Sequence, residues 1–300
     1  MKPTIVIHTN DKQMLGALVS AHSFRRNSPD PDAFDVRLIN ASEYPQLQEH
    51  GHSILRGGHE REWDPDDLQS FTPLRFAVPD LMGHEGLALV TDPDVFAVGD
   101  AGELFRRDLE GKAIWCRPRP GYQKITDPLA TSVMLLDCSR LPHWRFDENI
   151  KALWEHRIDY LDWINLKLEK LETIGLLEPE WNDFDHLTSK TKLLHNTKRR
   201  TQPWKTGMPV DFTLRERRGL MSLAMPIVRM MAPNYMRHPD RNQEAYFYAL
   251  LAEGLDTGSI ARLQVEEEIR RGHVRPDSLR LVDRYRGHLW PAEEAAPRAA

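Results

Sequence analysis

Short apolar runs and helical stripes alternate along the first half of the chain. The run over 87–90 is continuous rather than alternating, which predicts a strand covered on both faces. The predicted strands are residues 4–8, 36–39, 87–90, 113–116 and 132–136. A helical stripe over 12–24 follows the first strand, and Asp100 and Glu103 have the spacing of a capping box that opens a helix over 104–108. This alternation predicts an α/β fold in which helices flank a mostly parallel sheet.

A longer helical stripe follows the last of these strands. Apolar residues between Ile150 and Leu171 recur with a helical period, which predicts one long amphipathic helix, or two end to end, closed by Gly175. On such a helix Asp159 and Asp162 are three residues apart and would share one face.

The pattern predicts two parts in the chain. Residues 1–205 contain the predicted strands, including a short one over 193–195, and residues 206–300 form a helical C-terminal extension with a helix over 260–271. A Met-rich segment within 214–237 is flanked by arginines, so it either lies on an anionic membrane surface or is buried as helices broken by a proline. We favour burial, because the proline interrupts the amphipathic stripe.

Composition and charge exclude several classes of protein. Hydrophobic residues make up 40% of the 300 residues and charged residues 28%, as in ordinary globular proteins. A net charge of −5 argues against a general nucleic-acid binder, so an anionic ligand must meet a local basic patch. The two cysteines form no zinc motif or disulfide framework, and no apolar run reaches the roughly 20 residues of a membrane span. We expect a cytoplasmic protein, with membrane association left open.

Two carboxylates directly follow the predicted strand over 87–90. Asp92 and Asp94 flank Pro93, whose fixed φ favours an extended, rigid segment. Ligands of open α/β sheets bind at the carboxyl ends of strands, where two such oxygens can hold Mg²⁺ or Mn²⁺ beside a diphosphate. A solvent-exposed turn explains the same residues about equally well.

Several further motifs follow one another in an informative order. These are a first strand and polar loop over 5–11, an arginine-bearing segment over 71–81, the Asp-Pro-Asp block over 87–105, a strand over 130–137 and a His…Pro-Trp loop over 195–204. Together they resemble the nucleotide-sugar glycosyltransferases of the GT-A fold, most closely glycosyltransferase family 8, which includes glycogenin and lipopolysaccharide galactosyltransferases. The resemblance covers about residues 4–205.

The resemblance implies a metal site. His195 would be the third ligand beside Asp92 and Asp94, with Asp92 also reaching the ribose, although a histidine in this position taken alone is more often simply packed. Carboxylate oxygens and a neutral imidazole suit Mn²⁺, with Mg²⁺ as the alternative.

The resemblance also implies contacts with the nucleotide. Arg75 would bind the donor, although a surface salt bridge is the simpler interpretation of this residue alone. The side chains expected to hold the uracil and ribose are Thr9, Asn10 and Asp11.

A basic segment over 190–205 is either a solvated surface or a loop that closes over the donor diphosphate. The family has a lysine just before its Pro-Trp pair, where this chain has Gln202. Lys198 or Lys205 would therefore take the role of that lysine.

On the sugar side, Asp162 or Asp159 resembles the acid that approaches the anomeric carbon, with a plain surface acid as the alternative. The implied function is the metal-dependent transfer of a hexose from a UDP-sugar to a hydroxyl acceptor, with retention. The acceptor is a glycan, a lipid-linked molecule or a small molecule.

Two other functions remain open at this point. A sugar-1-phosphate nucleotidyltransferase usually has a glycine-rich phosphate loop after its first strand, and residues 8–13 contain no glycine. A catalytically silent nucleotide-sugar binder would explain why sugar-side motifs of the family are missing, such as its tyrosine, which is Gln13 here.

Overall fold

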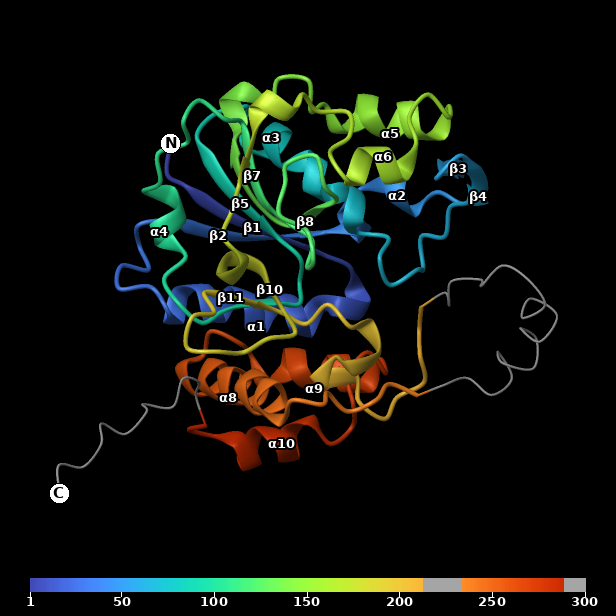
Figure 1. Cartoon of the computed structure of the whole chain (residues 1–300). Helices are drawn as coiled ribbons and strands as arrows, with labels where there is room; N and C mark the ends of the chain where they lie inside the picture. The colour runs from blue at the N-terminus through green and yellow to red at the C-terminus, as the bar shows by residue number, and fades with distance from the viewer. Residues whose placement is uncertain (213–233, 289–300) are drawn as a thin grey trace.

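The computed structural model describes residues 1–212 and 234–288, and a six-stranded sheet runs through its centre (Figure 1). In spatial order the strands are β2 (Asp35–Asn40), β1 (Thr4–Thr9), β5 (Leu87–Thr91), β8 (Leu129–Asp137), β7 (Ile114–Pro118) and β9 (Ile174–Leu176). β1 is parallel to β2 and β5, and β7 is parallel to β9, whereas β8 is antiparallel to both of its neighbours. The predicted α/β fold with a mixed, mostly parallel sheet is confirmed.

The two faces of the sheet pack against different helices, because successive residues of a strand point to opposite faces. On β8, Met134 and Leu136 enter one apolar cluster, and Val133 and Leu135 enter another. The helices of the first cluster are α2 (Pro45–Gln48), α3 (Val78–Leu81), α5 (Phe146–Trp154) and α6 (Tyr160–Ile164). The second cluster includes residues of α1 (Met14–Arg26) and α4 (Gly102–Phe105).

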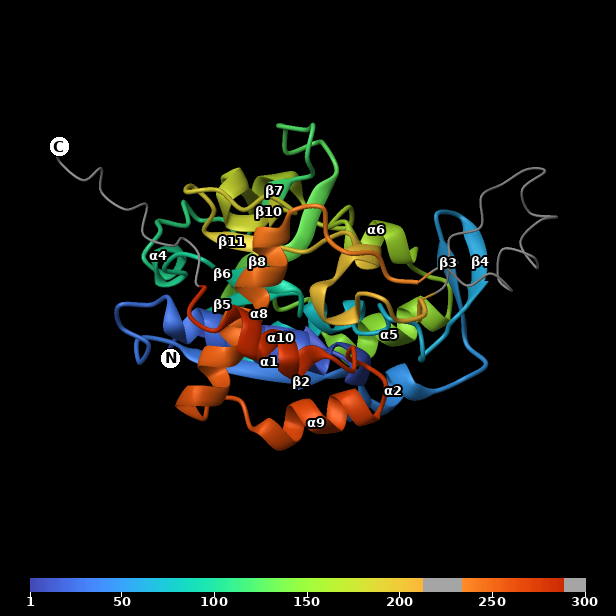
Figure 2. The same ribbon diagram turned by 90° about the horizontal axis from the view of Figure 1, so that it is seen from below.

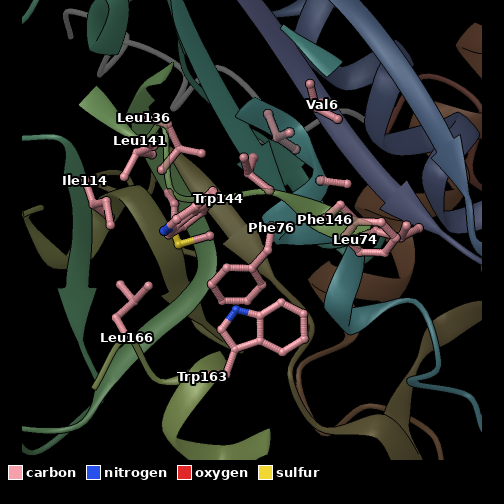
Figure 3. Packing of buried hydrophobic residues seen from close by; sticks show 14 of the residues in the cluster. Val6, Leu74, Phe76, Ile114, Leu136, Leu141, Trp144, Phe146, Trp163 and Leu166 are labelled. Carbon is pink, nitrogen blue, oxygen red and sulfur yellow. The ribbon is translucent and has the colours of Figure 1, made fainter. Parts of the chain in front are cut away.

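Aromatic side chains fill the first cluster. The ring of Phe76 lies between Trp144 and Trp163, with centroid separations of 4.6 and 4.4 Å (Figure 3). This contact ties the segment that carries Arg75 to α6, since Trp163 belongs to that helix.

Helix α1 is buried on two sides. Ala17 and Phe24 face the sheet cluster, and Leu15 and Val19 belong to a third cluster with the C-terminal helices. Those helices are α8 (Arg241–Thr257), α9 (Arg262–Arg270) and α10 (Ser278–Tyr285). Figure 2 shows α8 and α10 in front of α1, and Figure 1 shows α1 between them and the sheet. The prediction of helices after the sheet is therefore confirmed for the described part of the extension.

Two smaller sheets complete the described structure. One pairs β6 (Val95–Ala97) with β11 (Leu193–His195) in antiparallel fashion, and β11 in turn with β10 (Asp183–Phe184). The other is a hairpin of β3 (Ser53–Arg56) and β4 (His59–Glu62). The first of these small sheets matters for the site, because its strands begin and end beside the Asp-Pro-Asp segment.

The segment with the long helical stripe does not form the single helix that was one of its two predictions. The chain leaves α5 after Trp154, and His156 adopts a left-handed φ of 57° before α6 begins. Two helices therefore exist, as in the second alternative, but both are shorter than the stripe. Gly175 does not close a helix; it lies in β9, where a Cβ atom would stand 2.4 Å from the Trp115 ring.

The predicted capping box before α4 is only half formed. Asp100 accepts a hydrogen bond from the backbone N–H of Gly102 at 2.8 Å, whereas Glu103 forms an ion pair with Lys192 at 2.7 Å instead of returning to the helix start. The Met-rich segment and the C-terminal tail fall in 213–233 and 289–300, outside the described residues. Within the described ranges, no helix has the length and apolar character needed to cross a membrane.

Candidate metal and nucleotide site

Three side chains predicted from sequence come together at the carboxyl end of β5. Asp92 and Asp94 follow that strand directly, and the antiparallel register of β6 and β11 places His195 opposite Val95, next to Asp94. One ligand atom from each of the three residues lies within 4.8 Å of the others. The geometry thus forms one candidate metal cluster from two separate stretches of chain.

Asp92 is held by a guanidinium and an imidazole. One terminal nitrogen of Arg75 lies 2.6 Å from both carboxylate oxygens, and Nε2 of His8 lies 2.8 Å from Oδ1. Burial raises the pKa of Asp92, but the charge of Arg75 and the hydrogen bond with His8 outweigh burial and keep that pKa well below its usual range. Burial also lowers the pKa of His8, so its ring is neutral at physiological pH. Asp92 is therefore an ionised carboxylate whose charge Arg75 balances.

Arg75 itself is buried rather than part of a surface ion pair. Its second terminal nitrogen donates to Oγ1 of Thr131 at 2.8 Å, and that hydroxyl donates to the backbone carbonyl of Ile164 at 2.7 Å. The arginine therefore connects the carboxylate cluster to the end of α6.

The His195 ring is oriented from behind by an amide. Nδ1 of His195 lies 2.8 Å from Oδ1 of Asn182, whose Nδ2 donates to Oγ of Ser132 at 3.0 Å. Oγ of Ser132 lies 3.2 Å from the same Nδ1. With Asn182 in this orientation its oxygen accepts from Nδ1, so Nε2 of the neutral ring presents a lone pair.

The lone pair on Nε2 faces a carboxylate oxygen, which also carries lone pairs. Nε2 of His195 lies 3.3 Å from Oδ1 of Asp94, and two such atoms attract each other only with a cation or a proton between them. Burial lowers the pKa of His195, but the nearby Asp94 carboxylate more than reverses this and raises it. Two carboxylate oxygens and an imidazole nitrogen oriented in this way fit a divalent ion such as Mn²⁺.

A cavity of about 260 Å³ opens beside the cluster. Its wall includes all three candidate ligands and the guanidinium-bearing residues Arg119 and Arg199. The remaining lining residues are Gln13, Leu68, Gln69, Phe71, Arg75, Pro93, Ala130, Thr131, Ser132, Phe184, Thr197 and Gln202.

The predicted base-binding residues lie at the end of β1 and in the turn that follows it. Asn10 donates through Nδ2 to the carbonyl of Leu68 at 3.2 Å, while its Oδ1 is buried and has no partner among the described residues. Oδ1 of Asp11 accepts from Asn40 at 2.7 Å, and the Thr9 hydroxyl donates to the Asn10 carbonyl at 3.1 Å. These residues do not line the cavity, but their turn leads directly into Gln13, which does.

The predicted lysines lie away from the cavity wall. Lys205 is fully buried in an ion pair with Asp211, with 2.6 Å between the charged atoms, and burial lowers its pKa. Lys198 is exposed, and its backbone N–H donates to Asp185. The basic residue of this segment that lines the cavity is Arg199, which donates to Gln69.

The two predicted sugar-side acids also lie outside the cavity wall. Asp159 is the N-cap of α6 and accepts from the backbone N–H groups of Leu161 and Gly58, each at 2.7 Å. Asp162 forms a half-exposed ion pair with Lys167 at 2.6 Å.

Sequence reasoning missed several residues of this site. The sequence identified His8 only as the end of a strand, and Asn182 belongs to no motif. Gln13 and Gln202 stand where the family has a tyrosine and a lysine, and no role was predicted for either amide. Arg119 lies in a proline-rich stretch, and nothing in the sequence placed it at the same cavity as Arg199.

No family model matches the chain, and no curated protein matches it. Among solved structures, the bifunctional glycosyltransferase WbbM is similar at 12% identity and a TM-score of 0.47, over 68% of this chain and 47% of that one. The galactosyltransferase LgtC is similar at 14% identity and 0.46, over 67% and 89%. The glycosyltransferase GlyE of Streptococcus pneumoniae is similar at 15% identity and 0.49, over 86% and 64%.

This chain therefore spans less than half of the length of WbbM. All three proteins are glycosyltransferases by name. Identities and superpositions this low assign no activity, so the function is inferred from the side chains of the cavity.

Proposed function

We propose that this protein is a glycosyltransferase that moves a sugar from a nucleoside diphosphate sugar to a hydroxyl group. One observation carries the proposal: two carboxylates and a histidine gather within 4.8 Å at the wall of a cavity at the carboxyl end of β5. Burying such groups is unfavourable unless a cation or a paired charge accompanies them. Arg75 pairs with Asp92, and Asp94 faces His195, so a bound cation would stabilise Asp94 and His195 together.

The charges of the cluster suit a divalent ion that carries a diphosphate. Arg75 balances Asp92, and a bound ion would take the place of any proton on Nε2 of His195, so Asp94 would contribute the remaining negative charge. A divalent ion held by Asp92, Asp94 and His195 leaves an excess positive charge, which a diphosphate would neutralise. When bound, the ion stabilises the negative charge that develops on the leaving diphosphate. Mn²⁺ is favoured because one ligand is an imidazole nitrogen.

The side chains around the cavity would stabilise the departing nucleotide. Arg119 and Arg199 line the wall, and guanidinium groups bind phosphate oxygens through charge-assisted hydrogen bonds. Lys198 is exposed and directly precedes Arg199, so it remains the proposed lysine near the phosphates. Lys205 is paired with Asp211 and would contact a phosphate only if that ion pair broke.

The transfer step balances without a further reactant. The bond between the anomeric carbon and the β-phosphate oxygen breaks, and its electron pair stays on the phosphate. The acceptor oxygen forms the new bond to the same carbon, and its proton passes to the leaving phosphate oxygen. This route retains the configuration at the anomeric carbon, as the family resemblance implies.

The sugar side of the proposal depends on α6. Asp162 remains the proposed acid near the anomeric carbon, because the end of its helix reaches the cavity through the Thr131 hydroxyl. A UDP-hexose is the proposed donor, and the acceptor is a hydroxyl of a glycan, a lipid-linked molecule or a small molecule.

A second candidate is a nucleotide-sugar-binding protein without activity. It is favoured by the cavity wall, whose described residues include no carboxylate other than Asp92 and Asp94. Hydrolysis of the donor separates the two candidates, because a transferase with Mn²⁺ releases some sugar to water and a binder does not.

Thermal unfolding with UDP, GDP and CMP tests the proposal, each nucleotide being added with Mn²⁺ and with EDTA. A ligand at a hundred times its Kd adds about 2.7 kcal/mol to stability, which is easily measured. We expect a shift with one nucleotide that needs Mn²⁺ and is lost in Asp94→Ala. The absence of any shift with all three would contradict the proposal.

A further inference from the structure

The cavity wall contains a buried amide oxygen without a hydrogen-bond donor. Gln13 ends the short turn after β1, is only 2% exposed and lines the cavity. Its Oε1 atom has no hydrogen-bond partner among the described residues. Buried acceptors are nearly always paired, so an unpaired one beside a ligand cavity indicates a donor that arrives with the ligand.

The orientation of this amide follows from Asp94. A carboxylate accepts hydrogen bonds, so Gln202 must turn Nε2 toward Oδ2 of Asp94, 3.2 Å away. Oε1 of Gln202 then faces Gln13, whose Nε2 donates to it at 3.1 Å. Rotating either amide by a half-turn would bring two oxygens together. Oε1 of Gln13 is therefore the atom that can accept a hydrogen bond from a ligand.

The hydrogen-bond chain also locates this acceptor relative to the proposed ligand. Gln13 is two hydrogen bonds from Asp94, which belongs to the candidate metal cluster. If the diphosphate sits on that cluster, the nucleotide group joined directly to it is the ribose, and the free ribose hydroxyls are donors.

We infer that Gln13 accepts a hydrogen bond from a ribose hydroxyl of the bound nucleotide and so selects ribonucleotides over deoxyribonucleotides. The inference rests on the proposed function and names a specificity residue for it. The same amide orients Gln202 on Asp94, so nucleotide and metal binding share one hydrogen-bond chain.

Calorimetric titration with Mn²⁺ tests the inference on the full chain. The ligands are UDP, GDP and CDP, each with its 2′-deoxy and 3′-deoxy forms. For the base that binds, we expect the wild type to bind one of the two deoxy forms roughly tenfold more weakly, as for the loss of one hydrogen bond. Gln13→Met keeps the length of the side chain but removes the acceptor, so it should bind the ribo and deoxy forms equally.

Gln69→Met is the matched control, because Gln69 also lines the cavity but its Oε1 already accepts from Arg199. This control should keep the difference between ribo and deoxy forms. Gln13→Ala repeats the test in case the Met variant fails to fold, as judged by its unfolding temperature without ligand.

Three results would overturn the inference. Equal binding of all three sugar forms by the wild type, or an undiminished preference in a folded Gln13 variant, contradicts it and leaves the proposed function standing. Binding of no nucleoside diphosphate by the wild type contradicts the proposed function as well.

Discussion

The two acidic segments that stand out in the sequence have opposite surroundings in the fold. Asp92 and Asp94 have side chains 13% exposed, and their partners are charged or polar side chains from other strands and loops. Asp159 instead accepts from backbone N–H groups at the start of α6, and Asp162 pairs with a lysine five residues away on the surface. Acids of the second kind stabilise local structure, whereas acids of the first kind are buried and depend on charged partners from distant parts of the chain.

The largest effect should come from removing the cation of the first segment. Arg75→Met leaves Asp92 buried without its charge partner, and breaking such a pair costs about 3–5 kcal/mol. The matched control is Lys167→Met, which removes the partner of the half-exposed Asp162 and should cost at most about 1 kcal/mol. Urea unfolding measures both, and equal losses would contradict the contrast between the segments.

The pH dependence of stability sharpens the same contrast. The pKa of Asp92 is lower in the folded protein than the value of about 3.9 expected in the unfolded chain. Below that unfolded value the unfolded chain binds more protons, so this contribution to stability is complete above it and is lost as the pH falls toward the folded pKa. Acid unfolding of Arg75→Met should therefore show a shallower slope in this window than the wild type. An identical slope would mean that Arg75 does not set the pKa of Asp92.

The amide behind His195 should matter for metal binding more than for folding. Asn182→Leu removes the acceptor that fixes the ring, and loss of such a partner typically weakens metal affinity by about 10–100-fold. The control is Asn165→Leu beside α6, where Asn165 accepts from Arg119 outside the metal cluster. Mn²⁺ titration of both variants decides the point, and similar Mn²⁺ affinities would rule out the orienting role.

The close contact between α1 and the first segment predicts a smaller effect. A Cβ atom at Gly16 would lie 2.8 Å from the carbonyl oxygen of Pro93, so Gly16→Ala must displace the Asp-Pro-Asp backbone. We expect a loss of about 1–3 kcal/mol in the free energy of unfolding, as for other overpacked sites, and weaker Mn²⁺ binding. A more stable Ala variant, as helix propensity alone would give, would show that the contact relaxes freely.

The smallest effect is expected in the second segment. Asp159→Ala removes the N-cap of α6 and should cost about 1 kcal/mol of stability without changing nucleotide or Mn²⁺ affinity. Donor hydrolysis by Asp159→Ala and Asp162→Asn tests the catalytic role predicted for each. A large loss of hydrolysis with unchanged stability in either variant would place that acid in the reaction.

The sequence predicted the parts of the site that depend on strand ends and charge. Asp92 and Asp94 were found because they follow an apolar run, and His195 because it belongs to an ordered set of motifs. The sequence could not predict the roles of Asn182, Gln13 and Gln202, since neutral amides gain their roles only from partners distant along the chain.

Elements that depend on tertiary packing were also beyond the sequence. The break between α5 and α6 occurs at His156 without a glycine or proline to announce it. The sequence placed Lys205 among the cations of a basic loop. In the structure it lies in the interior beside Asp211 and the ring of Tyr235. Burial of a lysine needs such partners, and no local pattern reveals them.

The most direct test of the metal cluster is Mn²⁺ binding followed by electron paramagnetic resonance, in the presence of the nucleoside diphosphate that stabilises the protein. Free Mn²⁺ gives a strong signal that disappears on binding, so the stoichiometry and Kd follow from one titration. The account predicts one Mn²⁺ per chain in the wild type and at least a hundredfold weaker binding in Asp94→Asn, beyond the loss expected for an indirect partner. Absence of binding, or equal binding by Asp94→Asn, would contradict the assignment of this cavity as a metal-dependent nucleotide site.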